Sequence, residues 1–173
     1  TKYVVDSVTL EDIRVKGQSK LGFHNGGQCV SLRGFKSENN CPAIRNESIN
    51  SLLTLIEAEL NGMAGAGEMA AIENTGYLLA RDCRTSGYKL AIDSKVGKDK
   101  KYHRTAADGA VSEFLSHDAY TLFPAPAKTL RLPLKETPKV PLHPLADWVS
   151  PVAFGARLQD KQDDTEAVQK AVD

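Results

Sequence analysis

The sequence contains no apolar run long enough to span a membrane, and its first residues form no signal-peptide pattern. Its charge is balanced, because 22 Lys and Arg residues stand against 22 Asp and Glu residues in a chain of 173. A neutral chain has no general electrostatic attraction to nucleic acid or to anionic membranes. We therefore expect neither nucleic acid nor a membrane among its partners.

Cysteine and histidine are scarce, and neither is arranged as a metal site. Cys29, Cys41 and Cys83 lack metal-ligand spacing, and the four histidines form no ligand set and no triad. Cys29 and Cys41 could pair, although an odd number of cysteines argues against an obligatory disulfide framework. We expect no metal and no cofactor, and we predict that Cys83 is a small buried apolar residue.

Two short motifs recur in phase between Val8 and Asp93. In the first, apolar residues stand two and then three positions apart, and its four copies follow one another at spacings of 22, 23 and 25 residues. The second places an apolar residue just before Asn or its isostere Asp. Repeats of about 20 to 30 residues are typical of solenoids, whose turns bury their apolar faces against each other. The copies of the first motif are Val8-x-Leu10-x-x-Ile13, Val30-x-Leu32-x-x-Phe35, Leu53-x-Leu55-x-x-Ala58 and Leu78-x-Ala80-x-x-Cys83. The copies of the second motif are Phe23-His24-Asn25, Ile44-Arg45-Asn46, Ile72-Glu73-Asn74 and Ile92-Asp93.

The first motif predicts strands that bend. Apolar residues two apart face the same side of a strand, and a third one, three positions further on, faces that side only after a bend. We therefore predict two short strands per turn, stacked in parallel, with Leu10, Leu32, Leu55 and Ala80 in the core. Earlier turns are expected before the first copy, because the chain enters it without a capping element.

The second motif predicts a ladder of Asn side chains, since amides at equivalent bends can hydrogen-bond along the stack. A leucine-rich repeat has a similar period, but there the Asn follows the strand by about three residues. Here Asn25 follows Ile13 by twelve. The pattern therefore favours an all-β fold, a right-handed parallel β-helix, over a leucine-rich horseshoe or a β-sandwich.

Four further segments interrupt or follow the repeat. Residues 62–67 are rich in glycine, but no Lys-Ser/Thr pair follows, so we favour a surface loop over a phosphate loop. The basic run at residues 95–104 could contact a polyanion, although such runs are more often solvated. Residues 111–123 are expected to add one or two strands. Seven of the eight prolines lie in residues 124–151, which predicts an extended connector.

Residues 152–173 carry the most specific local motif. It resembles the opening motif of pectate-lyase-like β-helix domains, F-G-A-x-G-D-G-x-T-D-D-T followed by A-x-Q-x-A-x-D. The chain has Leu158-Gln159-Asp160 where that family has Gly-Asp-Gly. The matching residues are Phe154, Gly155, Ala156, Asp163, Asp164, Thr165, Ala167, Gln169, Ala171 and Asp173.

The aspartates in this motif have a structural interpretation and a catalytic one. Asp164 or Thr165 can cap the first amides of a helix that begins there, and an acidic residue at that end suits the helix dipole. Asp163 and Asp164 could instead form a catalytic pair, but we favour capping. The apolar face of the predicted helix would close the end of a coil; it consists of Val168, Ala171 and Val172.

The order of the segments implies two β-helices. We predict that residues 1–123 are the last turns of a first parallel β-helix, 124–151 a proline-rich linker, and 152–173 the start and cap of a second. This resembles the tandem β-helix proteins, such as family-55 and family-28-related glycoside hydrolases. The resemblance implies a secreted or periplasmic polysaccharide-processing protein, either a hydrolase or a lyase, of which this chain is a part that serves mainly as scaffold. Its implied partners are a polysaccharide and the remaining turns of the parent chain. A tailspike-like or adhesin-like protein without catalysis is the alternative.

One carboxylate pair has a position that the repeat itself constrains. Aligned turns place Asp12, Gly34, Glu57 and Asp82 in one column, so that neighbouring turns bring Glu57 and Asp82 within about 5 Å. This separation suits a retaining glycosidase, and the two residues are the candidate catalytic residues. The competing interpretation is a solvated charge ladder, which we favour. It would include the next column, formed by Arg14, Lys36, Glu59 and Arg84.

Overall fold

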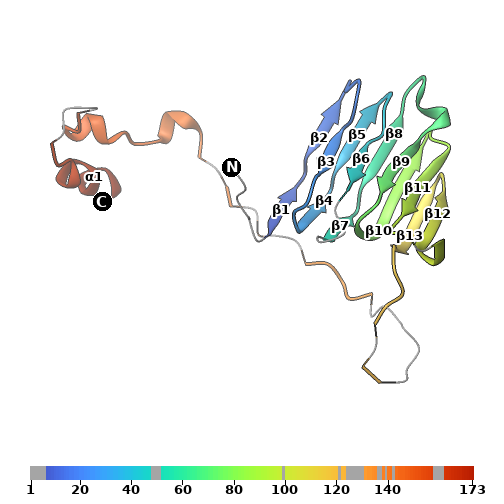
Figure 1. Cartoon of the computed structure of the whole chain (residues 1–173). Helices are drawn as coiled ribbons and strands as arrows, with labels where there is room; N and C mark the ends of the chain where they lie inside the picture. Colours follow the sequence, from blue (N-terminus) through green and yellow to red (C-terminus); the bar gives the residue numbers. More distant parts are fainter. Residues whose placement is uncertain are drawn as a thin grey trace. The chain divides into compact units, whose positions relative to one another are not determined.

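A computed structural model gives the structure of the chain. It describes residues 7–47, 52–98, 100–120, 122–123, 131–135, 138, 140–141, 143–157 and 162–173. The chain divides into two compact units, Thr1–Ala127 and Lys128–Asp173. The first unit is built mainly of strands, and the second contains short helical segments (Figure 1).

The first unit is a parallel β-solenoid of about four turns, as the repeat predicts. Each of the first three turns has three strands rather than the predicted two, because the apolar-x-Asn motif forms a strand of its own. In the fourth turn, the first two strands are merged into one long strand. The turns are β1 (Val8–Glu11), β2 (Arg14–Lys16) and β3 (Phe23–Asn25); β4 (Val30–Arg33), β5 (Lys36–Asn39) and β6 (Ile44–Asn46); β7 (Leu52–Ile56), β8 (Glu59–Gly62) and β9 (Ala70–Asn74); and β10 (Tyr77–Ser86) and β11 (Leu90–Lys95).

Stacking of the turns follows the spacing of the sequence motifs. Val8 pairs with Val30, Val30 with Leu53 and Leu53 with Leu78, so the first strands of all four turns lie side by side. The second strands stack in the order β2, β5, β8 and the end of β10, and the third strands in the order β3, β6, β9 and β11. The copies of each motif are therefore structurally equivalent.

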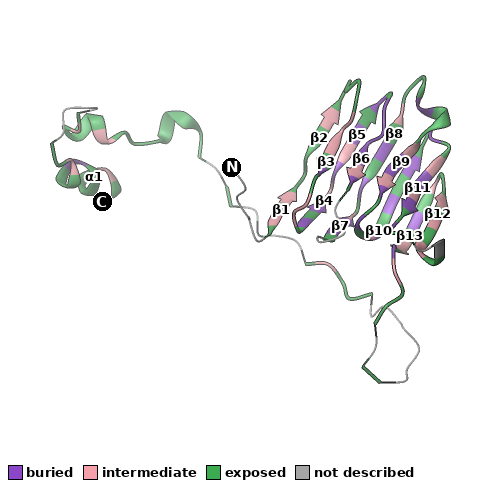
Figure 2. Cartoon of the chain, in the orientation of Figure 1, coloured by how far each residue is buried: buried purple, intermediate pink, exposed green. Residues whose placement is uncertain are grey.

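The residues predicted to face the core are buried in three of the four turns, as expected for an apolar interior. Leu32, Leu55 and Ala80 are at most 1% exposed, and Cys83 is buried (Figure 2). Leu10 is only partly buried, and Ile13 is 36% exposed, because no earlier turn covers the first one among the described residues.

A left-handed residue separates the first two strand positions of each turn. Asp12, Gly34, Glu57 and Asp82 have φ between 53° and 64°. This bend turns the residue after it, such as Phe35, back toward the core, where it is fully buried. The aligned column of Asp12, Gly34, Glu57 and Asp82 is therefore a column of backbone bends.

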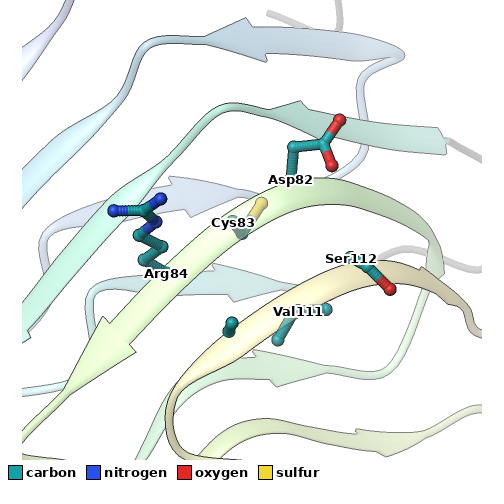
Figure 3. Close-up of a pocket in the computed structure, with 6 residues that line it drawn as sticks. Asp82, Cys83, Arg84, Val111 and Ser112 are labelled. Atoms are coloured by element: carbon teal, nitrogen blue, oxygen red, sulfur yellow. The ribbon is translucent and has the colours of Figure 1, made fainter.

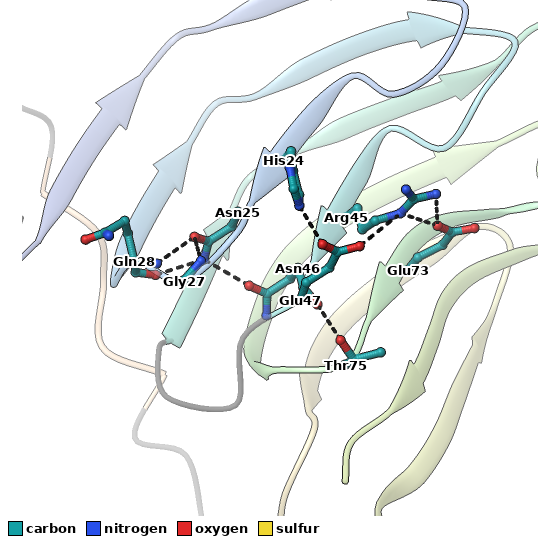
Figure 4. A network of polar contacts seen from close by, with 9 residues as sticks. All are labelled: His24, Asn25, Gly27, Gln28, Arg45, Asn46, Glu47, Glu73 and Thr75. Carbon is teal, nitrogen blue, oxygen red and sulfur yellow. Dashed lines mark hydrogen bonds and ion pairs between the residues drawn. The ribbon is translucent and has the colours of Figure 1, made fainter. Parts of the chain in front are cut away.

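The predicted Asn ladder is present and buried. Asn25 Nδ2 donates to Asn46 Oδ1 at 2.9 Å (Figure 4). Asn46 Nδ2 donates to Asn74 Oδ1 at 2.7 Å. The fourth member was predicted wrongly. Register places Ser94 opposite Asn74, so the Ser94 hydroxyl accepts the next bond at 2.7 Å, while Asp93 lies one residue earlier and pairs with Lys95.

Two antiparallel strands end the solenoid, within the segments where the repeat dissolves. β12 (His103–Ala107) pairs with β11, and β13 (Ala110–Leu115) pairs with β10. The turn between them is tied to the last coil, because Thr85 N donates to Gly109 O at 2.8 Å. The parallel stacking of the described turns therefore ends at β10 and β11.

The glycine-rich segment is more ordered than a simple surface loop. Residues Ala66–Glu68 form one 3-10 turn, and its first residue, Ala66, is fully buried. Gly62 and Gly87 pack against each other at this corner: a Cβ on Gly87 would lie 2.4 Å from Gly62 O. Their close approach explains the glycines at these two positions.

The second unit contains 3-10 turns at Leu145–Asp147 and Pro151–Phe154 and the helix α1 (Thr165–Val172). Asp163, not Asp164 or Thr165, supplies the capping oxygen, because Asp163 Oδ1 accepts from Thr165 N at 2.9 Å. The hydrogen bonds from Thr165 lower the pKa of Asp163. Asp164 accepts instead from Arg157 N at 3.2 Å. Of the predicted apolar face, Val168 is 46% and Val172 77% exposed.

Candidate functional site

The outer surface of β1, β4, β7 and the first half of β10 forms one sheet face, which we call the first face. Alternation along each strand points every second side chain outward. Hydroxyls and charges therefore line up in columns across neighbouring strands. One column holds Thr9, Ser31, Thr54 and Leu79, and the next holds Glu11, Arg33, Ile56 and Arg81.

Glu57 and Asp82 lie on neighbouring turns in the bend column at the edge of this face. Glu57 N donates to Arg81 O at 3.0 Å, the same contact that Gly34 N makes with Ile56 O. Glu57 Oε2 pairs with Arg33 Nε at 3.0 Å, and Asp82 Oδ2 with Arg81 Nε at 3.1 Å. Arginines that are themselves mostly buried thus neutralise both carboxylates. This arrangement differs from two carboxyl groups that face one substrate atom.

The column beside the bends forms part of a charge ladder. The register aligns Arg14, Lys36, Glu59 and Arg84. Lys36 Nζ lies 2.9 Å from Glu59 Oε2, with both side chains about half exposed. Exposed pairs of this kind contribute little to stability.

A second row of ion pairs runs along the outer surface of the third strands, beside the Asn ladder (Figure 4). His24 Nε2 lies 2.8 Å from Glu47 Oε2, and Arg45 lies 2.8 Å from Glu73 and 3.8 Å from Glu47. This row explains His24 as a surface residue beside the ladder.

The basic run at residues 95–104 has acidic partners. Lys95 pairs with Asp93 at 2.6 Å, and Lys101 pairs with Asp118 at 3.4 Å. Arg104 also contacts Asp118. The hydrogen bonds from Arg104 and Lys101 lower the pKa of Asp118. Much of the charge of the run is therefore compensated within the unit.

A cluster that no sequence pattern predicted lies beside β12 and β13. The His117 ring stacks on Tyr77 with centroids 4.1 Å apart and on Tyr102 at 4.8 Å. His117 Nδ1 bonds the buried Ser116 hydroxyl at 2.8 Å, which also accepts from Leu78 N at 2.8 Å. These residues meet only because β13 returns antiparallel along β10.

All three cysteines are free thiols. Cys29 is exposed and Cys41 is buried, so the disulfide considered for them is not formed. Burial raises the pKa of the Cys83 thiol. No group of three or more metal-ligating side chains occurs among the described residues. Among the same residues, no helix is long and apolar enough to cross a membrane.

No protein-family model matches the chain, and neither the curated proteins nor the solved structures provide a match. The fold is therefore assigned from the structure itself. A parallel β-solenoid is compatible with polysaccharide-processing and with structural roles.

Proposed function

We propose that the solenoid is a glycan-binding scaffold of an exported polysaccharide-processing protein, and that this chain catalyses no reaction by itself. The observation that carries the proposal is the column of hydroxyls on the first face, where Thr9, Ser31 and Thr54 lie side by side on three successive turns. A linear polysaccharide presents hydroxyl groups at regular intervals, and hydroxyls repeated from turn to turn can hydrogen-bond several of its units at once.

Two further features support this proposal. The motif at residues 152–173 resembles the opening of pectate-lyase-like β-helix domains, which implies polysaccharide processing, export, and further turns in the parent protein. The neutral overall charge gives no competing reason to bind nucleic acid.

The positions of Glu57 and Asp82 support the part of the proposal that concerns catalysis. Each carboxylate occupies a left-handed bend and is paired with an arginine. We expect Glu57→Gln in the parent protein to leave turnover of its polysaccharide within a few-fold of wild type. A thousandfold loss with an unchanged melting temperature would place the active site at these bends.

Binding is tested by affinity electrophoresis of the chain in gels that contain β-glucan, pectin or alginate, with product release assayed in parallel. The double variant Thr9→Val/Thr54→Val removes two hydroxyls from the first face and keeps β-branched side chains. Each lost hydrogen bond is worth about 0.5–1.5 kcal/mol, so binding should weaken roughly tenfold.

Thr105→Val is the matched control, because Thr105 is an exposed threonine on β12, in the other sheet. Retardation by none of the polysaccharides would contradict the proposal, as would equal retardation of the double variant. A parent protein that binds a glycan without cleaving it would support the adhesin-like or tailspike-like alternative, and turnover by this chain alone would refute the claim that it lacks catalysis.

A further inference from the structure

A hollow of about 250 Å³ opens where β13 crosses the last bend of the solenoid (Figure 3). Its polar lining comes from Asp82 and Arg84 on β10 and Ser112 on β13; the remaining lining residues are Cys83, Ala110 and Val111. Pockets for drug-sized ligands are about 300–1,000 Å³. The hollow is therefore of a size for one small polar unit.

The hollow exists because the stack of bends ends here. On the first three turns, the N–H of the bend residue donates to a carbonyl of the next turn, as Asp12 N does to Arg33 O at 2.9 Å. Beyond Asp82 the next strand is β13, which runs antiparallel. It pairs Arg81 with Glu113 and Cys83 with Val111, which places Ser112 opposite the bend.

The charges around the hollow are balanced, which suits a neutral ligand better than an ion. Asp82 offers carboxylate oxygens as acceptors and Arg84 offers donors, while the neighbouring Arg81 pairs with Asp82 and lies opposite Glu113 on β13. The Arg84 guanidinium makes no hydrogen bond or ion pair with any residue that the structure describes, so its donors are open to solvent or to a ligand. An anionic ligand would meet the Asp82 carboxylate, and a cationic one would meet Arg84.

We propose that this hollow binds one neutral sugar unit, through two adjacent hydroxyls, at the capped end of the glycan-binding face. A sugar hydroxyl both donates and accepts hydrogen bonds. One hydroxyl donates to Asp82, its neighbour accepts from Arg84, and the Ser112 hydroxyl can do either. The mostly buried Val111 and Cys83 provide an apolar floor for the C–H groups of the ring.

Recognition at this place would favour the end of a chain, because β13 is the last strand on this side of the sheet and the columns of the first face end there. The inference rests on the proposed glycan binding, and the ligands in the test separate the two claims. A neutral trisaccharide of glucose probes the hollow, and the long β-glucan probes the first face.

The test uses NMR titration of the full chain with β-1,3-linked glucose trisaccharide. We expect shift changes centred on Asp82, Arg84 and Ser112. Arg84→Met should weaken binding roughly tenfold, since hydrogen bonds to a charged group are worth about 1.5–3 kcal/mol. Ser112→Ala should weaken it several-fold. Arg14→Met is the matched control, because Arg14 occupies the same column on the first turn, and it should bind as wild type.

The oligogalacturonate of the same length should bind more weakly than the neutral trisaccharide. Shift changes elsewhere, unchanged binding by Arg84→Met, or stronger binding of the acidic trisaccharide would overturn the inference, even where the β-glucan binds the first face. Trisaccharide binding at the hollow without binding of any of the three polysaccharides would sustain the inference and refute the polysaccharide-binding face. Binding of neither the trisaccharide nor any of the polysaccharides would overturn both.

Discussion

Gly34 differs from the other three residues of the bend column, which are Asp or Glu. All four residues adopt left-handed φ, which costs a residue with a side chain about 1–2 kcal/mol. A Cβ on Gly34 would also lie 2.7 Å from Asp12 Oδ1. The second turn therefore avoids a strain that its neighbours accept.

We expect Gly34→Ala to lower the free energy of unfolding by about 1–2 kcal/mol, from the left-handed conformation alone. Displacement of the Asp12 side chain adds to this loss. Urea denaturation followed by circular dichroism measures the change. Gly67→Ala is the control, because Gly67 has ordinary φ and open space around its Cα; equal stability of the two variants would contradict the role given to the bend.

The Asn ladder is the element that ties the third strands together. Asn46 donates to Asn74 and to Tyr77 O and accepts from Asn25, all inside the coil. Buried amides left without a partner cost about 1–3 kcal/mol. Asn46→Ala should therefore destabilise the chain by that amount in thermal or urea unfolding, whereas Asn40→Ala, at an exposed position, should change it little. A loss no larger than that of Asn40→Ala would show that the ladder contributes no stability.

The cap formed by β12 and β13 contains a histidine whose protonation opposes folding. Burial lowers the pKa of His117, Arg104 lowers it further, and Asp118 acts in the opposite direction. Lys101 reduces the effect of Asp118 by pairing with it. A proton on Nδ1 would also disturb the bond to Ser116. Since the unfolded chain binds the proton more readily, stability is complete above the ordinary histidine pKa of about 6.5 and falls as the pH decreases below it.

Melting temperatures at pH 7.5 and 5.0 measure this effect. The decrease on acidification should be smaller in His117→Gln than in wild type. His103→Gln, an exposed neighbour on β12, should keep the wild-type decrease. An unchanged decrease in His117→Gln would contradict the assignment to His117.

The same elements show what the sequence could and could not predict. The inward positions and three members of the Asn ladder followed from spacing alone, because parallel stacking turns a repeat in sequence into a column in space. Ser94 was missed because the fourth copy has Asp93 one position too early and Ser forms the bond that Asn forms elsewhere. The hollow at Ser112 and the rings around His117 depend on an antiparallel return, and no periodic signal marks such a return.

At the scale of the whole molecule, the solenoid is stabilised mainly by contacts between neighbouring turns. Its last turn would expose two parallel strand edges if β12 and β13 did not cover them. Unpaired edges of this kind recruit strands from other molecules. The cap thus has two consequences: it ends the fold, and it prevents association through β10 and β11.

Truncation after Lys98 tests this role, because it removes β12 and β13 and uncovers the edges of β10 and β11. It also removes Val111 from the core and the Ser116 hydroxyl that accepts from Leu78 N. We expect concentration-dependent oligomers or insoluble protein in size-exclusion chromatography with light scattering. Truncation after Phe123 is the control: it keeps both strands, so the product should keep the association state of the full chain, with the melting transition of the solenoid unchanged. A Lys98 truncation that associates no more than this control and melts at the same temperature would show that the edges of the last turn need no cover.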